Sequence, residues 1–286
     1  MQRLSWFLRR LVRHPLALAG LIVLVLFALV ACFAPWLAPH RLSEFSLAMR
    51  LKPPLGIPGA DPRYSLGTDQ LGRDILSRVI YGARVSILVG FVAVGISLLA
   101  GGLLGGVAGY FGGRLDQLLS RFADLLMAFP YLLFTIFAMG ILGPGFGNLI
   151  LALTFKSWVE FFRLMRAEVL AEKTKEYVEA ARALGRGQGA TLVLEILPNV
   201  MHSLVVLATL RMGYLIIMEA SLSFLGLGVP PETPAWGSMV ASGRSNLLDA
   251  WWVSTVPGLF IVVLVLSINL LGEGLRDILD PRLRLD

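Results

Sequence analysis

The feature that most limits the fold of this chain is a set of four long runs without a charged side chain. They extend over 15–39, 85–113, 125–155 and 250–272. The hydrocarbon layer of a bilayer is about 30 Å thick, which about 20 helical residues cross. Inside that layer every backbone N–H and C=O needs a partner within the protein, and a helix provides one. The sequence therefore predicts an all-α integral membrane protein.

Two of the predicted spans need a further argument. The run 125–155 is too long for one span, and Gly143-Pro144-Gly145 within it is typical of a turn between two helices. The stretch 199–225 is apolar except for His202, Arg211 and Glu219, so these side chains must face protein or water instead of lipid. We therefore predict six transmembrane helices, at 15–37, 84–108, 119–142, 148–169, 199–225 and 252–274.

Composition excludes several other classes of protein. The chain is 56% hydrophobic and only 15% charged, whereas charged residues make up about a quarter of a soluble domain. The net charge of +6 comes from short, scattered basic clusters, without the basic stripe of a nucleic-acid surface. The first apolar run is longer than the roughly 7–15 residues of a signal peptide's apolar region, so it is predicted to stay as an uncleaved helix.

Basic residues next to the spans predict the orientation, because cytoplasmic loops are enriched in Lys and Arg. With six spans, most such residues fall on one side of the membrane. Both termini and the loop around residue 180 are therefore predicted to be cytoplasmic. The residues on that side are Arg3, Arg9, Arg10, Arg13, Arg114, Arg121, Arg163, Arg166, Lys173, Lys175, Arg182, Arg186, Arg276, Arg282 and Arg284.

A short polar helix is predicted in that loop, between the fourth and fifth spans. From Glu176 to Leu184, four residues share one face by helical spacing, and Gly185 suits the left-handed residue that ends a helix. We interpret the segment as a docking helix for a water-soluble partner, with a rigid junction at Leu197-Pro198 leading into the fifth span. An ordinary amphipathic connector on the membrane surface is the alternative. The shared face consists of Tyr177, Ala180, Ala181 and Leu184.

Two charged residues within a predicted span, Arg211 and Glu219, are the candidate residues of a translocation path. They could contact the carboxylate and amine ends of a zwitterionic peptide. As structural residues, the role that we favour, they could pair with a partner protein or hold the fifth span in place. Lys156 and Glu160 lie one helical turn apart and are predicted to form a surface ion pair. The three histidines are isolated in sequence, so no metal site is predicted.

Several motifs resemble those of a known family. Glu179-Ala180-Ala181, Gly185 and Ile196-Leu197-Pro198 are similar to the EAA loop of permease subunits of bacterial ABC importers. Glu195 departs from the general motif, which has an apolar residue at that place. The rest resembles the second, C-type permease of the dipeptide, oligopeptide and nickel importer family, over nearly the whole chain. The segments that carry this resemblance are 66–78, 220–228, 236–237 and 269–282.

The resemblance implies a type I ABC importer permease fold in the bacterial inner membrane. It implies that residues 1–82 form an N-terminal transmembrane helix and a periplasmic loop. Residues 83–286 would form a five-helix permease core with a coupling helix at about 175–186. Contacts with an ATPase are implied for the docking helix. Those contacts would come from Glu176, Tyr177, Glu179, Ala180, Ala181, Leu184 and Gly185.

The resemblance also implies partners: a second permease in a heterodimer, two ATPase subunits and a periplasmic solute-binding protein. ATP and Mg²⁺ would be bound by the ATPases, because this chain lacks the G-x-x-x-x-G-K-[ST] phosphate loop. No catalytic residue and no cofactor of its own are predicted. The predicted function is ATP-driven peptide import by alternating access.

Two alternatives stay open from the sequence. The same machinery could import nickel or another metal chelate. From a different class, a channel or secondary transporter would also explain the spans, although the sequence contains no selectivity-filter motif or inverted repeat. A membrane-embedded enzyme is disfavoured because catalytic motifs such as H-E-x-x-H and G-x-S-x-G are lacking.

Overall fold

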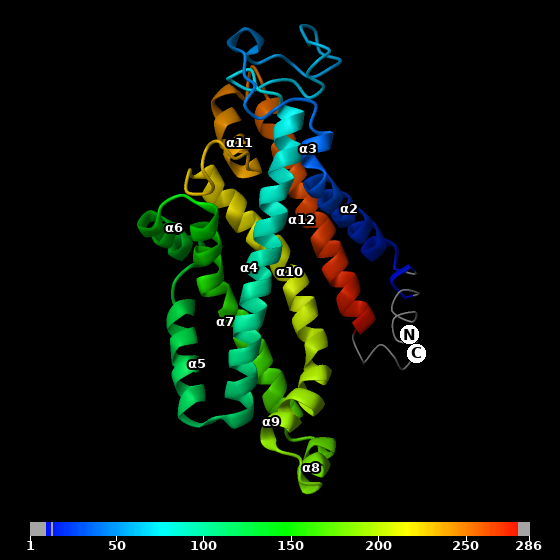
Figure 1. Cartoon of the computed structure of the whole chain (residues 1–286), viewed down its shortest axis with the longest axis vertical. Helices are drawn as coiled ribbons and strands as arrows, with labels where there is room; N and C mark the ends of the chain where they lie inside the picture. The colour runs from blue at the N-terminus through cyan, green and yellow to red at the C-terminus, as the bar shows by residue number, and fades with distance from the viewer. Residues whose placement is uncertain (1–9, 13, 280–286) are drawn as a thin grey trace.

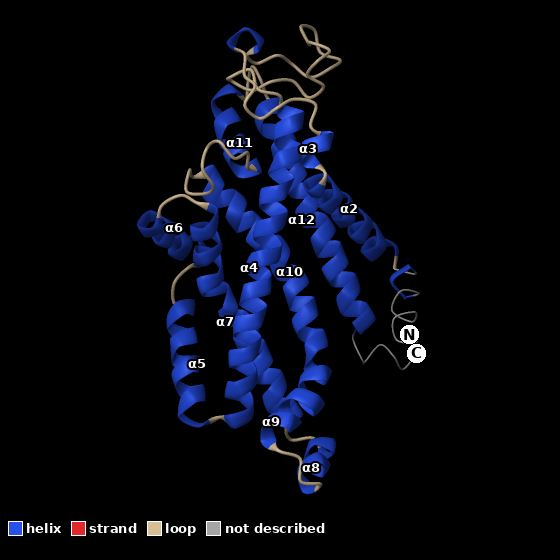
Figure 2. Ribbon diagram, viewed as in Figure 1, coloured by secondary structure: helices blue, strands red, loops and turns tan. Residues whose placement is uncertain are grey.

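The computed structural model describes residues 10–12 and 14–279, and within this part it is a bundle of helices without a β-strand. Long helices run side by side, and the largest loop region gathers at the end opposite helix α8 (Figures 1 and 2). The basic residues Arg3, Arg9, Arg13, Arg282 and Arg284 lie outside the described residues.

The first predicted span is shorter than expected. Helix α2 covers Pro15–Cys32, and a separate short helix, α3, covers Ala34–Leu37. The interruption at Phe33 comes two residues before Pro35, which has no N–H to donate and whose ring clashes with the preceding turn of a continuous helix. Helix α2 packs against α12 (Trp252–Leu279) so closely that a Cβ at Gly274 would lie 2.2 Å from Cβ of Ala17.

The second predicted span is longer than expected. Helix α4 covers Ile75–Phe111, so the helical end of the first loop continues into the span. Asp74 caps its first turn by accepting a hydrogen bond from the Ser77 N–H at 2.8 Å, as a helix N-cap does. The boundary predicted between residues 82 and 83 falls inside this helix. The division of the chain into residues 1–82 and 83–286 therefore stays a prediction.

Glycines on one face of α4 allow the close approach to α7 (Phe146–Glu172). A Cβ at Gly101 would lie 2.3 Å from the Trp158 carbonyl oxygen, and one at Gly105 would lie 2.4 Å from that of Phe162. Such distances are possible only because glycine has no side chain. The two helices are therefore in backbone contact at these positions.

The third predicted span is wrong as a single helix. Helix α5 covers Gly113–Met127 and α6 covers Tyr131–Leu142, and the two are bent by 91°. Pro130 lies in the break and cannot donate the backbone hydrogen bond that would continue the helix. The Phe129 carbonyl at the break accepts a hydrogen bond from Nζ of Lys156, so a side chain of α7 gives a partner to a carbonyl at the broken end.

The remaining helices follow the predicted order. Helix α7 is joined through α8 (Glu176–Ala183), α9 (Gln188–Ala190) and a π-helical turn (Thr191–Ile196) to α10. Helix α10 covers Leu197–Phe224. The helix α11 (Trp236–Gly243) precedes α12. Two short 3₁₀ helices complete the elements, at Leu47–Met49 and Arg244–Asn246.

By length and composition, four helices of the described chain can cross a membrane, and the bent pair α5–α6 could be a fifth. They are α2, α4, α12 and the continuous helical stretch Gln188–Phe224. Helix α7 is 27 residues long and about 40 Å in length, but charged side chains in its middle keep it outside that set. A sixth span at α7 therefore stays a prediction.

Candidate functional site

The predicted docking helix is α8, which projects from the end of the bundle opposite the large loop region (Figure 1). Tyr177 ties it to both flanking helices. Its hydroxyl donates to Oε1 of Glu172 at 2.7 Å and accepts from Nδ2 of Asn199 at 3.2 Å. Partial burial and the hydrogen bond to Glu172 raise the pKa of the Tyr177 hydroxyl, so it remains a donor at neutral pH. One side chain thus links the end of α7 to the start of α10.

Two further contacts hold α8 against the bundle. Val178 is fully buried, and the Arg182 guanidinium lies 5.3 Å from the centre of the Tyr110 ring near the end of α4, a cation–π contact. Sequence reasoning missed Val178 because it lies outside the face chosen by spacing. With these contacts α8 touches the ends of α4, α7 and α10, so a displacement of α8 would be transmitted to three long helices.

Of the face of α8 chosen from the sequence, Tyr177 contacts the bundle, and the space beside this face is open. Tyr177, Ala180, Ala181, Leu184 and Gly185 line an open hollow of about 440 Å³. Leu184 is 88% exposed there, an unusual state for a leucine beside two small alanines. Glu176 and Glu179 are exposed too. All the predicted docking residues lie on α8 or directly after it, and all except Tyr177 and Ala181 are exposed.

Glu195, the departure from the general motif, also lines this hollow. It forms an ion pair with Arg186. Gly185 has a φ of +82°, the left-handed conformation that favours glycine after a helix. The chain thus reverses at Gly185 and returns through the π-helical turn directly into α10.

The second candidate site lies in the membrane-spanning helices. Arg211 of α10 forms an ion pair with Glu160 of α7, a partner that the sequence did not indicate. The predicted surface ion pair of Lys156 with Glu160 is therefore wrong, because Glu160 pairs with Arg211 while Lys156 donates to the break between α5 and α6. Spacing along one helix could not reveal these partners, because both lie outside α7, on α10 and in the break between α5 and α6.

Glu219 is fully buried between α10 and α4. Its two carboxyl oxygens accept hydrogen bonds from Ser86 at 3.1 Å and Ser223 at 2.8 Å. Of the two roles left open for Glu219, this enclosed geometry supports the structural role that we favour, and contact with the solute stays a prediction. A buried polar group surrounded by donors acts in helix packing, since each hydroxyl needs an acceptor there.

We expect the Glu219→Leu change to destabilise the protein by about 1–3 kcal/mol, because it leaves the Ser86 and Ser223 hydroxyls without that acceptor. The Glu219→Gln change keeps a carbonyl acceptor and is expected to leave thermal stability and solute uptake near the native level. Thermal unfolding of the purified protein in detergent measures the first effect. A loss of uptake in the Gln variant with unchanged stability would contradict the packing role.

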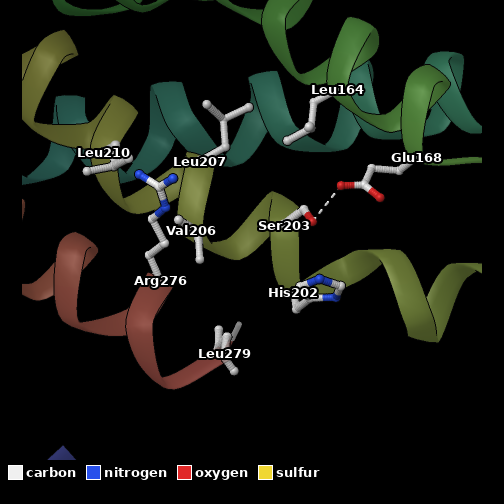
Figure 3. A pocket seen from close by; sticks show the side chains of 9 residues that line it. All are labelled: Leu164, Glu168, His202, Ser203, Val206, Leu207, Leu210, Arg276 and Leu279. Atoms are coloured by element: carbon white, nitrogen blue, oxygen red, sulfur yellow. Dashed lines mark hydrogen bonds between the residues drawn. The ribbon is translucent and has the colours of Figure 1, made fainter. Parts of the chain in front are cut away.

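A second hollow, of about 380 Å³, lies between α7, α10 and α12. Leucine and valine side chains form most of its wall, and Glu168, His202 and Arg276 are the ionisable residues among those that line it (Figure 3). Glu168 is engaged already, since it accepts a hydrogen bond from Ser203 at 2.7 Å. No sequence prediction fell on this hollow, because its residues come from three separate helices.

Comparison with known families decides the identity of the chain. Residues 101–285 match the family described as binding-protein-dependent transport system inner membrane component. The chain belongs to this family of transport permeases. Residues 4–54 of the permease also match the N-terminal transmembrane domain of oligopeptide transport permease C.

Curated relatives match this permease over nearly its whole length. It is 46% identical to the di/tripeptide transport system permease protein DppC of Pseudomonas aeruginosa, over 94% of this chain and 88% of that protein. It is 42% identical to the dipeptide transport system permease protein DppC of Haemophilus influenzae, over 94% and 91%. The probable D,D-dipeptide permease DdpC of Escherichia coli is 37% identical, over 98% and 91%.

The fold of the permease is that of a solved importer. A chain of the MetNI methionine ABC transporter in an inward-facing crystal form superposes with a TM-score of 0.58 at 20% identity, over 71% of this chain and 97% of that chain. The predicted type I ABC importer permease fold is confirmed. The family membership also confirms the resemblance to C-type permeases, the multi-pass inner-membrane location, and the prediction of a transport subunit instead of an enzyme.

Proposed function

We propose that this permease forms part of a path by which an ATP-driven importer moves di- or oligopeptides from the periplasm to the cytoplasm. The observation that carries the proposal is the 46% identity, over 94% of the chain, to a permease named for di- and tripeptide transport. Fold alone does not specify a solute. The sequence relationship supports peptides over other solutes because it extends through nearly the whole chain.

The permease works with partner subunits in this proposal. Two ATPase subunits bind ATP and Mg²⁺, a second permease completes the path, and a periplasmic binding protein delivers the solute. Both termini and α8 lie on the cytoplasmic side. The family description as the inner membrane component of a binding-protein-dependent transport system supports delivery of the solute by a binding protein.

Helix α8 is the element that docks into an ATPase. Its exposed outer face of Ala180, Ala181 and Leu184 is small enough to enter a groove, and Glu176 and Glu179 add negative charge at its first turn. Through Tyr177 the docked helix is joined to α7 and α10. Closure of the ATPases would therefore move the two helices that carry the Arg211–Glu160 ion pair.

A nickel or metal-chelate importer is the alternative within the same family. Among the described residues, no group of three or more His, Cys, Asp or Glu side chains is placed to hold a metal ion. A chelate could still cross without ligands from the protein, so uptake has to decide between the two solutes.

Uptake by the complete complex in proteoliposomes tests the proposal. With the cognate binding protein outside and ATP inside, we expect a radiolabelled dipeptide to accumulate, and a nickel chelate not to accumulate. Binding of both solutes to the binding protein alone provides the control for delivery. Dipeptide flux that does not depend on ATP would contradict an importer, and uptake of the chelate alone would favour the alternative.

A further inference from the structure

A cluster of charged and aromatic side chains joins α6, α7 and α10 near the middle of the bundle. The Arg211 guanidinium lies 5.1 Å from the centre of the Tyr214 ring. The Tyr214 and Tyr131 rings meet edge to face at 5.2 Å, and the Lys156 ammonium lies 5.8 Å from the centre of the Tyr131 ring. With Glu160, the ion-pair partner of Arg211, these five residues form what we call the central cluster.

The two ion-paired charges of the central cluster lie near half the length of the long helices that carry them. Arg211 is at the midpoint of Leu197–Phe224, and Glu160 is at the midpoint of Phe146–Glu172. If these helices cross the bilayer, the charges lie at its centre, where an ionised side chain is most costly unless it faces protein or a water-filled cavity. The central cluster therefore cannot face lipid.

This chain by itself leaves part of the central cluster uncovered. The side chains of Arg211 and Glu160 are each 29% exposed, in contrast to the fully buried Glu219 on the same helix. Tyr131, the first residue of α6 beyond the 91° bend from α5, lies at the edge of the cluster on the side of the break. An open, charged surface at this depth is a feature of a translocation path.

The charges of the central cluster do not balance. Arg211 and Lys156 are two cations, whereas Glu160 is the single carboxylate. Lys156 is committed to the Phe129 carbonyl at the helix break. A guanidinium has five N–H donors in a planar fork, and within the described chain the partners of Arg211 are Glu160 and the Tyr214 ring. Donors that suit a second carboxylate thus remain on Arg211.

We propose that the central cluster binds the transported peptide by its two charged ends, an inference that rests on the peptide import proposed above. Arg211 receives the terminal carboxylate, Glu160 receives the terminal ammonium, and the faces of Tyr131 and Tyr214 contact the chain between them. In the empty permease the Arg211–Glu160 pair satisfies both charges. The arriving solute exchanges this one ion pair for two, so neither charge is left unpaired at the centre of the bilayer.

The competing explanation is a purely structural ion pair, and a charge swap separates the two. The single changes Arg211→Glu and Glu160→Arg each place like charges together and are expected to lower dipeptide uptake at least about tenfold. Combining them restores an ion pair between α7 and α10. We expect the double variant to recover co-purification of the subunits and solute-stimulated ATP hydrolysis, while dipeptide uptake stays at least about tenfold below native. Recovery of native uptake would overturn the proposal.

A control for charge changes on α7 is the Arg163→Gln variant. Arg163 pairs with Asp124 of α5 at 3.3 Å, and both side chains are more than half exposed, so the change is expected to leave uptake within about twofold of native. If the Arg163→Gln variant lost as much dipeptide uptake as the cluster variants, any charge change on α7 would impair transport. The single changes in the central cluster would then no longer support the proposal.

A second experiment needs no substitution and so does not depend on how the variants fold. A dipeptide carrying a photoreactive diazirine is activated during turnover of the native complex, and mass spectrometry locates the label. We expect the label at Tyr131 or Tyr214, with competition by unlabelled dipeptide. Labels confined to other segments or to other subunits would overturn the proposal. If the native complex takes up no dipeptide at all, peptide import itself fails, and this result is distinct from either outcome.

Discussion

The Gly185→Val variant is expected to lose all solute-stimulated ATP hydrolysis in the assembled complex while still inserting into the membrane. Gly185 has a φ of +82°, a left-handed conformation that costs an L-residue about 1–2 kcal/mol and is least tolerated by a β-branched side chain. Valine would therefore unwind the end of α8 or fill the hollow beside Leu184. The measurement is the ATPase rate of the reconstituted complex with and without solute-loaded binding protein.

A matched glycine provides the control. Gly187 lies two residues further on, with an ordinary φ of −63° and open space around it, so the Gly187→Val variant is expected to keep stimulated hydrolysis. The Glu179→Trp variant, which places a bulky side chain on the exposed part of α8, is expected to behave like Gly185→Val. If both the Gly185 and Glu179 variants retained native stimulation, α8 would not be the docking helix.

The Gly101→Val and Gly105→Val variants are expected to disrupt the fold. Because a Cβ at these positions would lie 2.3 and 2.4 Å from carbonyl oxygens of α7, the two helices must separate. Overpacking of this kind costs about 1–3 kcal/mol even where only side chains are displaced, and here the obstacle is backbone. We expect a midpoint of thermal unfolding in detergent that is lower by several degrees, or loss of the monodisperse species.

Two other glycines of the same helix are matched controls. Gly95 has no atom within 4 Å of an added Cβ, and the nearest to Gly102 is at 3.9 Å. The Gly95→Val and Gly102→Val variants are therefore expected to unfold close to the native midpoint. Equal destabilisation by all four substitutions would mean that helix propensity, and not contact with α7, explains the glycines of α4.

Much of the architecture could be predicted because it depends on local properties. Helix α8 was expected from its spacing and from Gly185, and it lies at Glu176–Ala183. The start of α12 was expected at residue 252 and is found there. The single helix expected over 119–142 was wrong, although Pro130 was a visible signal for the break. The angle of the bend, 91°, depends on how the residues at the break pack against Lys156 and α7.

The amino-acid sequence by itself determined that the chain lies in a membrane, the order of its long helices, and that a polar helix separates two of them. A transmembrane span needs sufficient length and few charged side chains, and both properties can be read from the sequence alone. The tertiary structure alone decided that Arg211 pairs with Glu160, that Glu219 is enclosed by Ser86 and Ser223, and that Lys156 supports a helix break. These partners depend on how each helix is rotated about its axis and which helix it packs against, and spacing within one helix does not specify either.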